Sequence, residues 1–264
     1  MLPIERLPED EARGLRVLLF DLDDTLLTDG RLEESAYAAL FRLRESGLEL
    51  VAVTGRPLDW GGVLARQWPV SGVVTENGAV ACARGKSGLE IIDFGHAERS
   101  ARKARLAEIV GAVRSRFPEL RPSDDVQGRL TDFTFDIGEH ERVPVDTVNA
   151  VQSFARSLGA RTVASSVHVH LTLDGLDKAT GAARFLSTRL GMDPTECRMR
   201  AAFVGDSEND AACFSAFRTT LGVANLRGRP TVPPRFITTK EKGAGFAEAA
   251  AVIVARRGSG DGTG

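Results

Sequence analysis

Short apolar runs that end abruptly in polar residues recur along this chain, and they constrain its fold more than any other feature. Residues 17–20, 48–53 and 199–204 are such runs, and each has the length of one buried strand. Stretches with a helical pattern separate them, for example residues 33–46, which Gly47 would end. Strands that alternate with helices in this way predict a parallel α/β sheet.

The middle of the chain has a different pattern. Residues 130–137 alternate between apolar and polar side chains, which is typical of a strand with one buried face. Helices are expected at residues 96–117 and 145–158, and two further strands within residues 162–173. We therefore expect an α+β domain inserted into the first one. The predicted division is a discontinuous core of residues 1–84 and 174–256, an inserted domain of residues 85–173 and a disordered tail of residues 257–264.

Composition narrows the class of protein. The chain has 264 residues, 42% of them hydrophobic, and a formal net charge of −2. A near-neutral chain without a long basic stretch gives no reason to expect binding to nucleic acid. The charged N-terminus lacks a signal peptide, and no later segment resembles a membrane span. Because Cys82, Cys197 and Cys213 are scattered, we expect reduced core cysteines in a cytoplasmic protein.

Polar groups follow several of the expected strands, and one opens an expected helix. They are Asp21, Asp23 and Asp24 after the first strand, Thr54, Gly55 and Arg56 after the second, Lys178 at a helix start, and Asp206, Asn209 and Asp210 after a later strand. Ligands of open parallel sheets bind beyond the carboxyl ends of the strands, so we expect these groups to meet there. Such a set offers carboxylates to a divalent cation, and a hydroxyl, an amide and a lysine to phosphate oxygens.

These segments resemble the four motifs of the haloacid dehalogenase superfamily, in the family's order. DLDDT resembles the DxDxT signature, VAVTGR the second motif, GLDKATG the lysine motif and VGDSEND the terminal GDxxND motif. The long insertion and TENGAV resemble the type IIB cap subgroup, which includes Cof-like, sucrose-phosphate and mannosyl-3-phosphoglycerate phosphatases and phosphomannomutases. The resemblance covers residues 16–254 and rests on size and position in the inserted part. It implies a Rossmann-like core with a cap that selects the substrate.

The resemblance also implies catalytic roles. Asp21 would be the nucleophile that forms an aspartyl-phosphate. Asp23 would protonate the leaving oxygen and then activate the water that hydrolyses this intermediate. Thr54, the Gly55 amide and Lys178 would neutralise charge on the transferred phosphoryl group.

A Mg²⁺ cofactor is implied by the same resemblance. Its ligands would be Asp21, the backbone carbonyl of Asp23, Asp206 and a phosphate oxygen. Asp210 would lie behind these ligands or bind the ion through water. Asn209 is predicted to lie at the phosphate site.

Other polar residues have two interpretations each. Asp24 is predicted at the phosphate site, although turn formation is the favoured role of its side chain. Arg56 could meet the substrate or pair with a nearby acid. Asn77 most simply serves an Asn-Gly turn. His168 and His170 share one face of a strand, which either faces the substrate or is an ordinary exposed or core-edge face.

We therefore predict an enzyme, a Mg²⁺-dependent phosphatase acting on a small phosphorylated metabolite, with a phosphorylated sugar or sugar-acid glycoside as the expected substrate. A sugar phosphomutase or phosphotransferase with the same acids stays open as an alternative. A second alternative is a non-catalytic binding protein with a vestigial site. The sequence leaves open the physiological substrate and the choice between monomer and homodimer.

Overall fold

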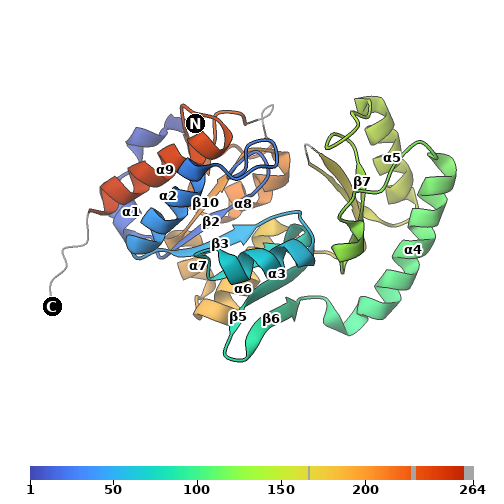
Figure 1. Ribbon diagram of the computed structural model, residues 1–264, viewed down its shortest axis with the longest axis horizontal. Helices are drawn as coiled ribbons and strands as arrows, with labels where there is room; N and C mark the ends of the chain where they lie inside the picture. Colours follow the sequence, from blue (N-terminus) through green and yellow to red (C-terminus); the bar gives the residue numbers. More distant parts are fainter. Residues whose placement is uncertain (166, 227–229, 259–264) are drawn as a thin grey trace.

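The computed structural model describes residues 1–165, 167–226 and 230–258, which form two units of unequal size (Figure 1). The larger unit contains a nine-stranded sheet, and the smaller one, with α4, α5 and β7, stands to one side of it. Of the expected disordered tail, residues 259–264 lie outside the described residues. Arg257, the first residue of that expected tail, is instead the last residue of a helix.

The large sheet has the strand order β1-β12-β11-β10-β2-β3-β4-β5-β6. The seven strands from β1 to β4 in this order are parallel, as predicted, whereas β5 and β6 extend the sheet as an antiparallel hairpin. The strands are β1 (Leu2–Pro3), β2 (Val17–Phe20), β3 (Glu49–Val53), β4 (Gly72–Thr75), β5 (Val80–Gly85), β6 (Gly88–Asp93), β10 (Ala201–Gly205), β11 (Thr219–Gly222) and β12 (Phe236–Ile237).

Helices cover both faces of this sheet. One face packs against α1 (Glu9–Gly14), α2 (Glu34–Glu45), α3 (Leu58–Gln67) and α9 (Lys242–Arg257). The other packs against α6 (Lys178–Leu190), α7 (Pro194–Arg200) and α8 (Ala211–Ala216). Single 3₁₀ turns are η1 (Ile4–Arg6), η2 (Glu76–Gly78), η3 (His96–Glu98), η4 (Val126–Gly128) and η5 (Glu208–Asp210).

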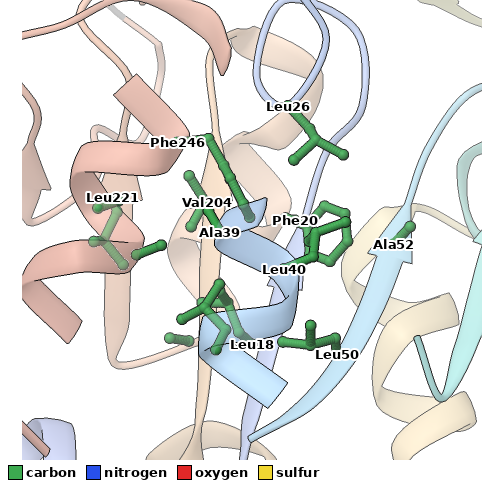
Figure 2. Close-up of a cluster of buried hydrophobic side chains, with 14 of the residues drawn as sticks. Leu18, Phe20, Leu26, Ala39, Leu40, Leu50, Ala52, Val204, Leu221 and Phe246 are labelled. Carbon is green, nitrogen blue, oxygen red and sulfur yellow. The ribbon is translucent and has the colours of Figure 1, made fainter. Parts of the chain in front are cut away.

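Successive residues of the central strand β2 enter opposite cores. Leu18 and Phe20 lie in the core with α2 and α9, where the rings of Phe20 and Phe246 are 5.3 Å apart (Figure 2). Val17 and Leu19 lie in the core with α6 and α8. Because both faces are buried, the strand is apolar at every position, which is the pattern seen in the sequence.

The second sheet is antiparallel, with the order β7-β9-β8, and packs against two helices. These elements are β7 (Asp132–Asp136), β8 (Arg161–Ala164), β9 (His168–Thr172), α4 (Arg99–Arg116) and α5 (Val145–Ser157). We call residues 94–177, between β6 and α6, the cap. The boundary predicted at residue 85 falls inside the β5–β6 hairpin, since both of its strands belong to the large sheet.

Residues on both faces of β7 are buried, whereas the alternation in its sequence predicted one buried face. Phe135 packs towards α4 and α5, as expected. Thr134, on the opposite face, is also fully buried. Thr134 is covered within the cap, where its hydroxyl contacts that of Ser123. Other residues of this polar face lie against the carboxyl edge of the large sheet, as the contacts below show.

The strand expected from residue 199 begins at Ala201, because Met199 and Arg200 still belong to α7. The three cysteines are buried and unpaired, as expected. In the described part of the chain no helix has both the length and the apolar character to cross a membrane.

Candidate active site

The carboxyl ends of β10, β2 and β3 meet because these strands are neighbours with aligned registers. Phe20 pairs with Val204 on one side and with Ala52 on the other. The residues that follow the strands therefore converge on one pocket. This pocket is lined by Asp21, Asp23, Gly55, Arg56, Ser165, His168, His170, Asp206, Ser207 and Asn209. The predicted site residues outside this lining are Asp24, Thr54, Lys178 and Asp210.

Close backbone packing brings Lys178 to the strand ends. The Asp177 side chain caps α6 by accepting a hydrogen bond from the Thr180 amide at 2.7 Å, so Lys178 is the first helical residue. The helix start lies directly on the turn after β4. A Cβ atom on Gly181 would be 2.3 Å from the Cα atom of Gly78, which itself has a φ of +100°. Glycine at both positions permits this approach.

The ammonium group of Lys178 lies between two carboxylates. Its Nζ is 2.9 Å from Asp21 Oδ2 and 2.8 Å from Asp210 Oδ1, and the side chain is 1% exposed. Burial by itself would lower the pKa of Lys178, but Asp21 and Asp210 outweigh it and raise that pKa. The lysine is therefore a fixed positive charge beside Asp21.

Three buried carboxylates gather at this point. Asp21, Asp206 and Asp210 each offer an oxygen within 4.8 Å of the others. Burial and the neighbouring acids raise the pKa of Asp21 to about 7 and that of Asp206 to about 8. A divalent cation would relieve this repulsion, and carboxylate oxygens are the ligands that Mg²⁺ and Ca²⁺ prefer. The donor set therefore fits a hard divalent cation.

Both carboxylate oxygens of Asp210 are already occupied by protein donors. Oδ1 pairs with Lys178, while Oδ2 accepts hydrogen bonds from the amides of Asp206 at 2.9 Å and Ser207 at 3.2 Å. This arrangement suits a residue that orients the ligands more than one that binds the ion directly. Asn209 lines the pocket, and its Oδ1 accepts a hydrogen bond from Ser207 Oγ at 2.5 Å.

Arg56 pairs with Asp23, one of the two interpretations that the sequence left open. Its Nε donates to Asp23 Oδ2 at 2.9 Å, and its Nη2 to Oδ1 at 2.8 Å. Nη1 donates to Glu139 of the cap at 3.1 Å. The guanidinium stacks 4.6 Å above the ring of Trp60. Thr54 is buried, and its Oγ1 accepts a hydrogen bond from the Arg56 amide, which fixes this loop.

Asp24 lies with the turn and with α9, and its carboxylate is not part of the pocket lining. Its φ of +57° is a left-handed conformation that aspartate tolerates. The carboxylate is 3.3 Å from Lys242 Nζ, and the carbonyl accepts a hydrogen bond from Asn225 Nδ2 at 2.9 Å. The geometry supports the role of Asp24 in shaping the turn.

Two histidines of the cap face the pocket. His168 Nε2 is 2.8 Å from Glu139 Oε2, and His170 Nδ1 is 2.8 Å from Asp132 Oδ2. Burial lowers the pKa of His170, which favours the neutral ring. Of the two interpretations of this strand face, the structure places it towards the pocket. Glu139, Asp132 and Ser165 were not found from the sequence, since no motif marks them.

Arg129 links the cap to the loop that follows β3, and no sequence motif marks this residue. Its side chain is fully buried, and Nη1 donates to Gly55 O at 2.9 Å and to Asp132 Oδ1 at 3.1 Å. A Cβ atom on Gly55 would lie 3.2 Å from both His170 Cε1 and Asn77 Oδ1. The absence of a side chain at Gly55 therefore lets the cap approach this closely.

A second buried link joins core and cap at Glu76. Its carboxylate accepts hydrogen bonds from the Thr131 amide and hydroxyl, both at 2.6 Å, and from the Leu130 amide at 2.8 Å. Burial raises the pKa of Glu76 to about 7. Asn77, assigned to the turn from the sequence, has a φ of +53°, and its buried Oδ1 accepts no hydrogen bond from the described residues.

Comparison with known proteins places this geometry in a family. Residues 18–95 match the model of the haloacid dehalogenase-like hydrolase family. A phosphoglycolate phosphatase of Pyrobaculum neutrophilum is 30% identical over 246 residues, which is 91% of this chain and 96% of the relative. A phosphoglycolate phosphatase of Pyrobaculum aerophilum is 29% identical over 245 residues, which is 90% of this chain and 96% of the relative.

Solved structures share the whole architecture, including the cap. A crystal structure from Thermoplasma acidophilum aligns with a TM-score of 0.72 at 20% identity, covering 90% of this chain and 98% of that one. The sucrose-phosphatase of Synechocystis aligns with a TM-score of 0.63 at 18% identity, covering 90% and 97%. Such similarity shows the fold, and the relatives above show the activity class. This chain belongs to the haloacid dehalogenase-like hydrolases and is a phosphatase.

Proposed function

We propose that the protein hydrolyses a small phosphomonoester through an aspartyl-phosphate on Asp21, with Mg²⁺ as cofactor. The observation that carries this proposal is the position of Asp21. Its carboxylate lines the pocket at the end of β2, beside the ammonium of Lys178 and opposite the carboxylate of Asp206. A carboxylate in this place can act as a nucleophile while fixed positive charge stabilises the phosphoryl group.

The reaction would proceed in two displacements at phosphorus. First, a carboxylate oxygen of Asp21 bonds to phosphorus as the bond to the ester oxygen breaks, and Asp23 gives its proton to that leaving oxygen. Then a water oxygen bonds to phosphorus, the bond to Asp21 breaks and Asp23 takes the proton from that water. Asp23 lines the same pocket as Asp21, as both steps require.

Mg²⁺ would be held by the carboxylates of Asp21 and Asp206 and by the carbonyl of Asp23, with Asp210 orienting the loop that carries Asp206. When bound, the ion supplies positive charge to the phosphoryl oxygens. Lys178 neutralises further charge from its buried position. The Gly55 amide and the Thr54 loop, fixed by the cap through Arg129, would bind the remaining phosphate oxygens.

The proposed substrate is a small phosphorylated acid, with 2-phosphoglycolate as the first candidate. The two Pyrobaculum relatives carry that name and align over nearly the whole chain. Sugar phosphates, the expectation from the sequence, are the second class to test. We place the reaction in the cytoplasm, where the three buried thiols stay reduced.

The test is a phosphate-release assay with Mg²⁺ over 2-phosphoglycolate, hexose phosphates and p-nitrophenyl phosphate. Asp21→Asn keeps the shape of the side chain and removes the nucleophile, so we expect its rate to fall at least about 10³-fold. Asp10→Asn, on the exposed face of α1, is the matched control and should keep full activity. Full activity of the Asp21 variant would refute the mechanism. Interconversion of hexose 1- and 6-phosphates without phosphate release would instead indicate a mutase.

A further inference from the structure

The guanidinium of Arg56 has donors that its protein partners do not use. A guanidinium has five N–H groups. The carboxylate of Asp23 accepts one hydrogen bond from Nε and one from Nη2, and Glu139 accepts one from Nη1. Nη1 also forms a longer ion pair with Asp125 Oδ2 at 3.7 Å. The second N–H group on Nη2 is therefore the donor that has no partner among the described residues. Since Arg56 lines the pocket, a ligand there can accept from it.

Arg56 also lies at the end of the pocket where the leaving group of the substrate would bind. In the proposed reaction, which this inference rests on, Asp23 contacts the ester oxygen that leaves. Arg56 is within 2.9 Å of the Asp23 carboxylate, so the carbon chain attached to that oxygen comes next to the guanidinium. A carboxylate on the first carbon lies only two bonds from the ester oxygen, which brings it within reach of the free N–H group on Nη2.

The charge of the pocket is a second reason to expect that Arg56 binds a carboxylate of the substrate. Asp21, Asp23 and Asp206 make the described pocket wall acidic, and among its residues Arg56 alone carries a permanent positive charge. A substrate with a carboxylate in addition to phosphate needs a cation at this end, whereas a neutral alcohol does not. Planar pairing with carboxylates is the particular strength of arginine.

The side chain is held in place before any ligand binds. It is 6% exposed, stacks on Trp60 and is tied to Glu139, which in turn bonds to His168. Such preorganisation lowers the entropy lost on binding. We propose that Arg56 is the specificity-determining residue of the pocket and selects phosphomonoesters whose alcohol carries a carboxylate beside the ester carbon.

The experiment compares two substrates of equal length, 2-phosphoglycolate and 2-hydroxyethyl phosphate, which differ in the carboxylate. We expect the wild type to prefer 2-phosphoglycolate in kcat/KM by about tenfold or more, since a hydrogen bond between charged groups is stronger than one to a neutral hydroxyl. Arg56→Met should bring this ratio close to one, mainly because the carboxylate-bearing substrate binds more weakly and its KM rises. Arg56→Lys should give an intermediate ratio, because it keeps the charge and loses the planar fork.

Arg42→Met, on the exposed face of α2, is the matched control for an arginine-to-methionine change and should preserve the ratio. A wild-type ratio near one, or an equal fall of both substrates in Arg56→Met, would overturn the inference while leaving the phosphatase mechanism intact. The wild-type ratio needs no variant to fold. If the wild type releases phosphate from neither substrate nor from p-nitrophenyl phosphate, the proposed function itself fails.

Discussion

Replacement of Lys178 by methionine is the sharpest perturbation of the acid cluster. Methionine fits a similar volume but leaves Asp21 and Asp210 without the ammonium that lies 2.9 and 2.8 Å from them. Removing one partner of a buried ion pair costs about 3–5 kcal/mol. For a chain of this size each kcal/mol lowers Tm by roughly 2–4 °C, so Lys178→Met should melt about 6–20 °C below the wild type.

The loss of stability in Lys178→Met should depend on pH, and its sign follows from the carboxylates. Without metal, the pKa of Asp21 is raised to about 7 and that of Asp206 to about 8, and Lys178 holds both down. Acids with a raised folded pKa stabilise the fold at low pH, and this contribution is lost as pH rises through the folded pKa. The deficit of the variant should therefore be smaller at pH 5, where Asp21 and Asp206 are protonated, and should grow as the pH rises above about 7.

The assay is thermal unfolding in EDTA, monitored by circular dichroism, at several pH values between 5 and 8. Lys103→Met, on the exposed face of α4, is the matched control and should shift Tm little at any pH. The activity of Lys178→Met should fall about 10²–10³-fold, the usual cost of one electrostatic group at a transition state. A variant as stable as the wild type at pH 8 in EDTA would show that the cluster is not held by this lysine.

Two further predictions concern the metal and the packing of α6. Added Mg²⁺ should raise Tm more at pH 8 than at pH 6, because it binds ionised carboxylates, and Asp206→Asn should remove most of this gain. No gain at pH 8 would contradict the metal site. Gly181→Ala should destabilise the protein by about 1–3 kcal/mol in urea unfolding, because its Cβ would meet the backbone of η2 at 2.3 Å. Gly111→Ala, in α4 with open space, should instead stabilise by roughly 0.5–1 kcal/mol, and a similar change in both variants would refute the packing argument.

The strands and helices of the core could be predicted from the sequence, because each depends on a pattern of neighbouring residues. Both faces of β2 are covered, so residues 17–20 form an uninterrupted apolar run. The segment before β10 was predicted less well. Met199 was assigned to the strand because it is apolar, but Asp193 and Glu196 form a capping box that starts α7, and this helix continues through Met199 to Arg200. The capping signal was present in the sequence and outweighs one apolar residue.

The acids at the strand ends follow from the sequence alone. Asp21 and Asp206 come at or near the ends of runs that can only be buried strands, and parallel strands bring their carboxyl ends to one edge. How the cap meets this edge depends instead on tertiary contacts. Arg56 bonds to Glu139, and Arg129 to Gly55 O, across 83 and 74 positions of the chain. Such contacts leave no periodic pattern, because they depend on where two separately folded surfaces come together.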